Sequence, residues 1–379
     1  MSGSQYLVVG AGLAGAATAW QLADRGHEVT LVERTEPAAH DGSSHGSARI
    51  FRYAYPERDY VEMVVRAAAG FRELERLHGA PLLTPTGALD HGSGRDPRAL
   101  ARVLESVGVE HELLDADAAR ARWPQIVVDG EVLHQPGGAV IDAESTVRAM
   151  VALAEAKGAR VLTGWPLERL ERTATGFTAH STEGRAIDAG HVVVSAGGWL
   201  PDLLGELPLP AGFLDAFPAL EVMQENAFHF PYRDEHPHGT WPTLIHKVPE
   251  IQVYALPGGR DAGFRGQKVA EYNGGRSIGS ASKQSGDVDG ANRSRVVDYV
   301  RRYLPGLVPE PYAETTCLFT NTPTEDFVID GTDGITVVSP CSGHGAKFAP
   351  LLGEIAADVA TGAAAAPERF RVGAVRAGA

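Results

Sequence analysis

Residues Tyr6–Gly15 read YLVVGAGLAG, a short apolar run that leads directly into the pattern G-x-G-x-x-G. Gly10 permits a tight turn, Gly12 lets the backbone approach a pyrophosphate, and Gly15 allows a helix to pack closely on the strand. The N-terminus of that helix then directs its amides at the phosphates. The stretch therefore predicts a dinucleotide site at the start of a β-α-β unit.

The residues that follow continue this unit. The spacing of apolar residues predicts a helix over Leu13–Ala23, which Gly26 ends, and a second strand over Glu28–Val32. Glu33 comes directly after that strand, where a carboxylate accepts a hydrogen bond from a ribose hydroxyl. A glycine-rich turn that binds no ligand would not require the helix, the second strand and Glu33 that follow here. We therefore expect a bound dinucleotide.

Composition narrows the class of protein. The chain has 379 residues, of which 44% are hydrophobic, enough to bury a large core in two domains. Its net charge of −14 argues against nucleic acid and against an anionic membrane as partners. Cys317 and Cys341 are too few for a disulfide framework, and no apolar run is long enough for a membrane span. No basic segment precedes Tyr6, so we expect no signal peptide and a cytoplasmic protein.

Later segments predict a second domain interleaved with the first. The loop Asp41–Gly46, rich in Gly and Ser, suits a second phosphate contact. The pattern changes between Pro81 and Pro136, which indicates an excursion into another domain. The apolar strand in His191–Trp199 ends in small residues and suits a second backbone approach to the dinucleotide. Alternating apolar and polar residues over Phe213–Leu307 favour an antiparallel sheet on the substrate side.

Five motifs follow one another along nearly the whole chain. They are Gly10-x-Gly12-x-x-Gly15 with Glu33, Gly46-x-x-Arg49-x-x-Arg52, Gly266-Gln267-Lys268-Val269, Cys317-x-x-x-Asn321, and Ser342-Gly343-His344-Gly345-x-Lys347-Phe348. In this order they resemble the monomeric sarcosine oxidase family. That family includes N-methyltryptophan oxidase, other N-alkyl amino acid oxidases, and the amadoriases that act on fructosyl amino acids. Its members use FAD to oxidise amines with oxygen.

The resemblance implies an α/β (α+β) fold with two interleaved domains. An FAD-binding domain of glutathione-reductase type would take residues 1–80, 143–212 and 316–379. A substrate domain built on a large antiparallel sheet would take residues 81–142 and 213–315. The partners would be a small-molecule amine and O2, and the chain would act as a monomer.

The resemblance also implies a reaction. A sarcosine-like amino acid with a secondary amine would transfer a hydride to FAD, and O2 would then be reduced to H2O2. An amadoriase acting on fructosyl amino acids by the same chemistry is the second candidate. A flavin-binding protein for electron transfer or assembly, without rapid oxygen turnover, is a candidate of another class. No metal-ligand cluster and no hydrolase motif occur, so the chemistry is left to the flavin.

Cys317 would, by this resemblance, be bonded through its sulfur to the 8α-methyl carbon of FAD. The alternative is a buried structural cysteine, the usual state of a free thiol. Cys341 is the competing thiol, which we expect to pack near the flavin. The other contacts to FAD would come from Gly10, Gly12, Leu13, Ala14, Gly15, Glu33, Arg34, Ser43, Ser44, Leu167, Ala196, Gly197, Trp199, Gly343, His344, Gly345 and Lys347.

Four cations and a histidine complete the expected site. Arg52 and Lys347 would bind the substrate carboxylate, one as a bidentate fork and the other as a point charge. The alternatives are a salt bridge of Arg52 within the following helix and a loop cap by Lys347. Arg49 and His45 would tune the charge beside the flavin, an ordinary loop histidine being the alternative for His45. Lys268 would stabilise negative charge that develops on oxygen.

The assignments around Lys268 have competitors. A solvated strand lysine is the alternative for Lys268 itself, and Arg265 is a neighbouring cation because Pro257–Phe264 carries extra residues relative to the family. Tyr272 stands where sarcosine oxidases tend to carry a histidine that faces the substrate, which leaves the substrate side chain open. Tyr254 would remain a substrate-facing hydroxyl. The turn Gly258–Asp261 is expected to be a solvent-exposed hairpin, and its alternative is a reshaped entrance to the site.

Overall fold

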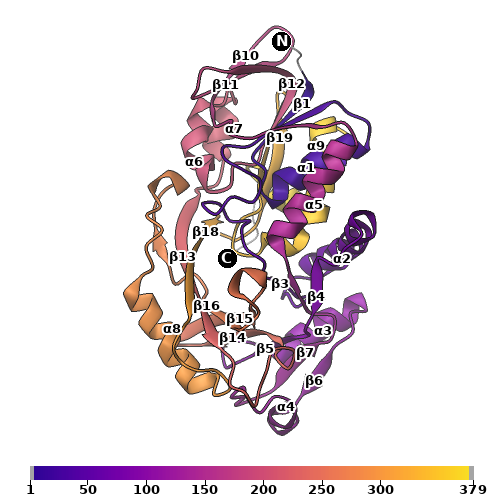
Figure 1. Ribbon diagram of the computed structural model, residues 1–379. Coiled ribbons are helices and arrows are strands. Elements are labelled where there is room, and N and C mark those ends of the chain that lie inside the picture. The colour runs from indigo at the N-terminus through magenta and orange to yellow at the C-terminus, as the bar shows by residue number, and fades with distance from the viewer. Residues whose placement is uncertain (1–3, 375–379) are drawn as a thin grey trace.

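Two large sheets organise residues 4–374, the part of the chain that the computed structural model describes. In Figure 1 the first sheet and its helices form the upper half, and the second sheet forms the lower half. A three-stranded sheet of β3 (Arg49–Phe51), β8 (Ala139–Ile141) and β4 (Leu83–Pro85) is separate from both. The site described below lies where segments from all three sheets meet.

The first sheet has a parallel centre in the order β20-β12-β1-β2-β9. Its parallel strands are β1 (Ser4–Val9), β2 (Val29–Val32), β9 (Arg160–Leu162), β12 (Ala186–Val194) and β20 (Ile335–Ser339). Antiparallel strands complete it, namely β10 (Leu167–Arg172), β11 (Phe177–Ser181) and β19 (Val328–Thr332). Because β12 is long, its first half pairs with β11 and its second half with β20.

Alternate residues of β1 face two different cores, as expected for a strand covered on both sides. Tyr6 and Val8 pack with α1 (Leu13–Asp24), α5 (Ala143–Ala156) and α9 (Ala349–Thr361), which lie against one another. Leu7 and Val9 pack into the opposite core, which includes residues of β10, β11 and α6 (Leu200–Leu203). The apolar run of the sequence therefore forms a central strand.

The geometry of the turn from β1 to α1 explains why the first and last residues of its motif are glycines. Gly10 has φ of +96°, and a Cβ there would lie 2.5 Å from the carbonyl oxygen of Ser195. A Cβ on Gly15 would lie 1.8 Å from the carbonyl oxygen of Gly10. The helix expected over Leu13–Ala23 and the strand expected over Glu28–Val32 are confirmed to within one residue at each end.

The second sheet is antiparallel except at one pair, β5 with β14. Its order is β17-β13-β16-β15-β14-β5-β7-β6, and β18 pairs with β13. The strands are β5 (Ala88–His91), β6 (Glu112–Leu114), β7 (Val132–Gln135), β13 (Glu221–Pro231), β14 (Thr243–Val248), β15 (Ile251–Pro257), β16 (Gly266–Glu271), β17 (Arg276–Ser277) and β18 (Ala313–Asn321). The antiparallel sheet expected over residues 213–307 is therefore present.

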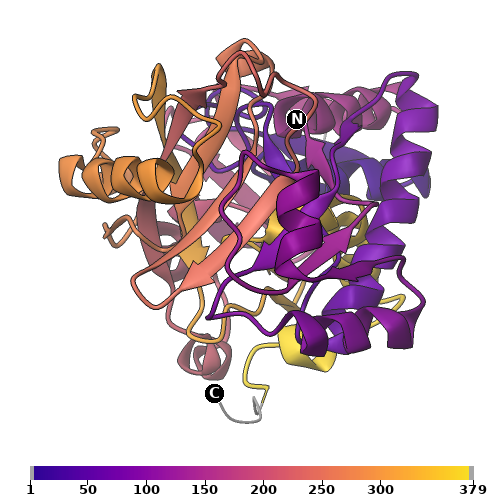
Figure 2. The same ribbon diagram turned by 90° about the horizontal axis from the view of Figure 1, so that it is seen from below.

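One helix in that segment was not expected. α8 (Gly290–Tyr303) covers the outer face of the second sheet, where Val296 and Val300 pack with Phe228 and Val269. Figure 2 shows α8 in orange on the side of the molecule opposite α2. The prediction of strands alone was wrong here because only a narrow apolar stripe faces the sheet and most of the helix is polar.

The two faces of the second sheet differ. Residues that pair across strands share a face, and residues two apart on one strand share it too. The pairs Leu256 with Lys268, His229 with Lys268, and Glu225 with Cys317 therefore set one face, opposite the one that α8 covers. Tyr254 belongs to this same face, which turns toward the first sheet.

The remaining helices are α2 (Arg58–His78), α3 (Pro97–Val107), α4 (Ala116–Arg122) and α7 (Ala211–Ala216). β18 crosses the expected domain boundary at residue 316 and lies wholly in the second sheet. The domain limits as such stay a prediction. None of the helices within residues 4–374 combines the length and the apolar character that a membrane span requires.

Candidate active site

Two cavities meet at the N-terminus of α1. The nucleotide cavity, of about 620 Å³, is lined by Gly10 and Gly12, whereas the substrate cavity, of about 360 Å³, is lined by Leu13 and Ala14. Both are lined by the loop residues Ser43 and Ser44. Together they form one elongated site with a helix N-terminus at its middle, where a pyrophosphate binds in dinucleotide folds.

The nucleotide cavity brings together most of the residues expected to contact a dinucleotide. Glu33 lines it, and its carboxylate accepts hydrogen bonds from the backbone amides of Ala11 at 2.7 Å and Thr35 at 3.1 Å. The guanidinium of Arg34 lies 4.5 Å from the ring centroid of Trp199. The expected residues that line this cavity are Gly10, Gly12, Glu33, Arg34, Ser43, Ser44, Leu167, Ala196, Gly197 and Trp199.

The substrate cavity brings together the rest, with two exceptions. The expected residues that line it are Leu13, Ala14, Ser43, Ser44, Arg49, Arg52, Tyr254, Lys268, Tyr272, Cys317, Gly343, His344, Gly345 and Lys347. Gly15 and His45 line neither cavity. Gly15 packs beneath the turn, as expected. His45 is buried, and desolvation and the charges of Arg49 and Lys268 lower its pKa to about 3, so it is neutral at pH 7.

Cys317 and Arg49 touch. The Nη2 of Arg49 donates to the sulfur of Cys317 at 3.6 Å and to the carbonyl oxygen of Ser43 at 3.1 Å. Cys341 lines the same cavity, as expected, but desolvation raises the pKa of its thiol to about 12. Among residues 4–374, Cys317 is the thiol that an arginine side chain contacts.

Lys268 is a buried cation and not a solvated strand lysine. Its residue is 5% exposed, and its Nζ donates to the carbonyl oxygen of Ala48 at 3.4 Å. Desolvation and the charge of Arg49 lower its pKa to about 8. The competing cation Arg265 is exposed and stacks on Tyr312, 4.5 Å from its ring centroid, outside both cavities.

Arg52 and Lys347 both lie beside Tyr55. The guanidinium of Arg52 lies 4.8 Å from the centroid of that ring, and the Nζ of Lys347 lies 5.5 Å from it. Lys347 is 4% exposed and donates to the Tyr55 hydroxyl at 2.9 Å and to the His344 carbonyl at 2.8 Å. Neither cation forms an ion pair with a carboxylate of residues 4–374.

This arrangement leaves positive charge without compensation. Desolvation and the charge of Arg52 hold the pKa of Lys347 well below its usual range. A buried cation without a counter-charge costs free energy, so an anionic ligand is its natural partner. The salt bridge considered for Arg52 within the following helix is not formed, because Arg52 donates to the Ala54 carbonyl instead.

Two tyrosines and a histidine shape the walls. Burial raises the pKa of Tyr254 and of Tyr272, so both remain protonated donors. The Tyr272 hydroxyl donates to the Ser342 carbonyl at 3.5 Å. His344 lies between the Tyr55 hydroxyl at 3.1 Å and the Glu325 carbonyl at 2.9 Å, and desolvation with the Lys347 charge lowers its pKa to about 3.

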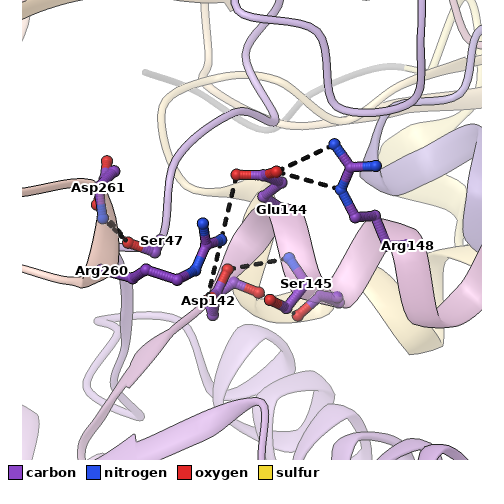
Figure 3. Close-up of polar contacts among 8 residues, drawn as sticks. Ser47, Asp142, Glu144, Ser145, Arg148, Arg260 and Asp261 are labelled. Atoms are coloured by element: carbon purple, nitrogen blue, oxygen red, sulfur yellow. Dashed lines mark hydrogen bonds and ion pairs between the residues drawn. The ribbon is translucent and has the colours of Figure 1, made fainter.

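The expectation of a solvent-exposed hairpin at Gly258–Asp261 holds only in part: Arg260 and Asp261 are exposed, but Gly258 and Gly259 are buried and the turn is docked. Arg260 reaches the first residues of α5, where its Nη2 lies 3.5 Å from a carboxylate oxygen of Asp142 and 3.2 Å from one of Glu144 (Figure 3). These ion pairs connect the second sheet to a helix of the first. The docking was not predicted because the contact joins segments that are far apart in the sequence.

The same turn holds the loop before β3. The Asp261 amide donates to the Ser47 hydroxyl at 3.0 Å, and that hydroxyl donates back to the Asp261 carboxylate (Figure 3). Gly259 leaves room for this contact, since a Cβ there would lie 2.3 Å from the Ser47 hydroxyl. Ala48, the next residue of the loop, accepts from Lys268. The turn therefore fixes the loop that surrounds Lys268.

Sequence reasoning missed several residues at the site. Tyr55, Arg95 and Lys247 line the substrate cavity, and none of them belongs to a motif. Glu225 is 2% exposed, sits opposite Cys317, and has a pKa that burial raises to about 7. The signal that could have identified Glu225 and Lys247 is the pairing of the strands. Because side chains alternate along a strand, that pairing places both residues on the sheet face that carries Lys268.

Comparisons with known proteins agree with this geometry. The family model described as "FAD dependent oxidoreductase" matches residues 5–359. Monomeric sarcosine oxidase from Bacillus sp. (strain NS-129) is 32% identical over 382 residues, covering 94% of this chain and 92% of that protein. N-methyl-L-tryptophan oxidase from Citrobacter koseri is 32% identical over 368 residues, covering 94% of each chain.

Solved structures show the same fold. NikD, described as an unusual amino acid oxidase essential for nikkomycin biosynthesis, matches with a TM-score of 0.85 at 24% identity, covering 100% of this chain and 99% of that one. L-proline dehydrogenase from P. horikoshii matches with a TM-score of 0.80 at 19% identity, covering 96% of this chain and 94% of that one. The chain therefore belongs to the family of FAD-dependent oxidoreductases that includes monomeric sarcosine oxidase and N-methyl-L-tryptophan oxidase.

Proposed function

We propose that this protein oxidises N-substituted amino acids with a secondary amine, reduces O2 to H2O2, and holds its FAD covalently through Cys317. The observation that carries the proposal is the pair Arg52 and Lys347, two cations without carboxylate partners among residues 4–374, in the same cavity as Lys268 and Cys317. An amino acid carboxylate supplies the missing charge. Relatives at 32% identity are named as oxidases of N-methyl amino acids, which supports the same reading.

The residues present fit FAD. Gly12 opens the phosphate end of the nucleotide cavity, since a Cβ there would lie 2.9 Å from the Ser44 hydroxyl. Gly12 has no side chain to cap α1, and the Ser44 hydroxyl accepts from the Leu13 amide at 3.0 Å, so a phosphate would meet this helix end beside Ser44. Glu33 would accept from the ribose, and the substrate cavity beyond Leu13 would hold the ring system. Bound FAD would accept a hydride from the carbon next to the amine and return the electrons to dioxygen.

The chain's own residues bind and orient the substrate. Arg52 would engage the carboxylate with a planar fork and Lys347 with a point charge, which fixes the amino acid at two points. Tyr254, on β15, presents a hydroxyl donor to the same cavity, and Tyr272, whose hydroxyl donates to the Ser342 carbonyl, shapes its wall. Holding the amine in this orientation converts a bimolecular encounter into a positioned one and accounts for part of the rate.

Lys268 serves the oxidative half of the reaction. Its ammonium is held by the Ala48 carbonyl and desolvated by its surroundings, so its field is only weakly screened. A preorganised cation stabilises negative charge as that charge develops on oxygen. This function favours an oxidase over a flavin protein that only passes electrons to a partner.

A substrate panel tests the proposal. Purified enzyme is offered sarcosine, other N-methyl amino acids, and fructosyl amino acids, and H2O2 release is measured in air. Bleaching of the flavin absorbance is followed separately without oxygen. We expect both signals with N-methyl amino acids. Signals with fructosyl substrates alone would make it an amadoriase, and bleaching without peroxide would make it an electron-transfer protein.

A further inference from the structure

The substrate cavity holds more positive charge than one carboxylate requires. Besides Arg52 and Lys347, it is lined by Arg95, which follows β5, and by Lys247, near the end of β14. Neither belongs to a sequence motif. Their position is set by the one parallel pair of the second sheet, β5 with β14.

Arg95 and Lys247 are held side by side by backbone contacts. The Gly94 amide donates to the Lys247 carbonyl at 2.8 Å, and the Arg95 amide closes a tight turn on the Gly92 carbonyl at 2.9 Å. A Cβ on Gly94 would lie 3.3 Å from the Cβ of Lys247, so the loop lies directly on that strand. The backbone segments that carry the two cations are therefore held side by side, and the charge of Arg95 acts on Lys247.

The carboxylates nearby compensate only part of this charge. Asp90 forms an ion pair with Arg95 and also accepts from Gln135 at 2.8 Å. The Arg95 side chain is 9% exposed, yet its Nε–H has no acceptor among residues 4–374. Glu57 and Glu325 also line the substrate cavity, but both are exposed, Glu325 accepts from Asn273 at 3.3 Å, and neither forms an ion pair with Lys247 or Arg95 within residues 4–374.

Lys247 supplies the positive charge that no carboxylate compensates. It forms no ion pair within residues 4–374, and its Nζ lies 5.8 Å from the ring centroid of Tyr272. Desolvation, followed by the charges of Arg95 and Arg52, lowers its pKa, while Glu325 and Asp90 act in the opposite direction more weakly. In a protein of net charge −14, three adjacent cations at one cavity wall are an arrangement that attracts anions.

We infer that the substrate carries a second anionic group, which Lys247 and Arg95 bind, and is therefore an N-substituted acidic amino acid. This inference rests on the proposed function. The first carboxylate goes to Arg52 and Lys347, and the second to the pair formed by Lys247 and Arg95. A neutral side chain of equal size leaves that pair without an anion in a desolvated place, so it binds less well.

Two isosteric substrates test the inference. N-methyl-L-glutamate and N-methyl-L-glutamine differ in charge and hardly in size, and kcat/KM is measured for both by H2O2 release. We expect wild-type enzyme to prefer the glutamate by roughly 10- to 100-fold, the range of a charged hydrogen bond. Lys247→Met should bring the ratio close to one, and Lys247→Arg should retain it. Lys283→Met, which removes an exposed lysine outside the cavity, should leave the ratio at its wild-type value.

Binding without turnover gives a second readout. Glutarate and butyrate, a dicarboxylate and a monocarboxylate, are titrated against the flavin absorbance of wild-type and Lys247→Met enzyme. Tighter binding of glutarate that disappears in the variant supports the inference. A wild-type ratio near one, or a ratio that Lys247→Met does not change, overturns it while leaving the proposed function intact. If neither of these two substrates bleaches the flavin while sarcosine does, the inference fails and the proposed function stands; if no N-methyl amino acid bleaches it, the proposed function fails and the inference with it.

Discussion

The guanidinium of Arg49 donates a hydrogen bond to the sulfur of Cys317, 3.6 Å away. Arg49 lies on β3 and Cys317 on β18, so the contact joins two separate sheets at the wall of the substrate cavity. Reactive cysteines are typically found beside a cationic side chain. Cys341 has the opposite environment, since desolvation raises its pKa to about 12.

We therefore predict that FAD is attached to Cys317. Acid-precipitated wild-type protein should stay yellow, and its intact mass should exceed that of the polypeptide by one FAD. Cys317→Ser should release the flavin on denaturation, and Cys341→Ser should not. An adduct that survives in Cys317→Ser would move the bond to Cys341 or to another residue.

The charges of Arg52 and Lys347 give a second prediction. Lys347→Met should weaken the binding of N-methyl amino acids by about 1.5–3 kcal/mol, because a charged hydrogen bond is lost. The corresponding decarboxylated amines should be affected much less. Thermal stability should change little, since the variant removes a desolvated cation without a carboxylate partner in the described structure but also its hydrogen bonds to the Tyr55 hydroxyl and the His344 carbonyl. Equal losses for acids and amines would show that Lys347 supports the fold or the flavin.

The packing of α1 gives a third prediction. Gly15→Ala would place a Cβ 1.8 Å from the Gly10 carbonyl, so the helix must shift away from the dinucleotide turn. We expect a loss of roughly 1–3 kcal/mol in unfolding free energy, typical of overpacking, together with lower flavin content. Gly212→Ala in α7 is the control, since a Cβ there meets nothing within 4 Å. Similar melting temperatures for both variants would contradict the packing argument.

The dinucleotide half of this fold could be predicted because its signals are local. The turn after β1, the helix that follows it, and Glu33 lie within thirty residues of one another. Each of them independently indicates a dinucleotide site. Cys317 and Lys268 were found through motifs. Cys317 contacts Arg49, and Lys268 contacts Ala48, because separate sheets pack together in the fold. No local sequence pattern encodes such contacts.

The residues that were missed depend on register and on docking. Lys247 reaches the cavity because β14 pairs in parallel with β5, and Arg95 joins it because Gly94 binds the Lys247 carbonyl. Arg260 is exposed, as the sequence predicts, but its docking is not predicted because its partners, Asp142 and Glu144, are more than one hundred residues away. Such contacts are tertiary, and composition and periodicity contain no signal for them.

The pKa of Lys268 gives a prediction about pH. Desolvation and the charge of Arg49 lower this pKa to about 8, so the ammonium is present below that value and is lost above it. If the cation accelerates oxygen reduction, the rate of flavin reoxidation should be high at pH 7 and should fall as the pH rises through 8 or above, since an anion bound nearby raises the pKa. Stopped-flow reoxidation from pH 6 to 10 measures this. A rate that rises over this range would contradict the role of the cation.

Substitution of Lys268 separates the two halves of the reaction. Lys268→Met should fold and retain its flavin, and substrate should still bleach that flavin under anaerobic conditions, because the proposed role concerns oxygen and not the amine. Reoxidation should slow by roughly 10²- to 10³-fold, the effect of removing one preorganised electrostatic donor. Arg265→Met is the control, since Arg265 lies outside both cavities and stacks on Tyr312. If Lys268→Met reoxidises as fast as wild type while Arg265→Met is slow, the cation that assists oxygen reduction is Arg265 and not Lys268.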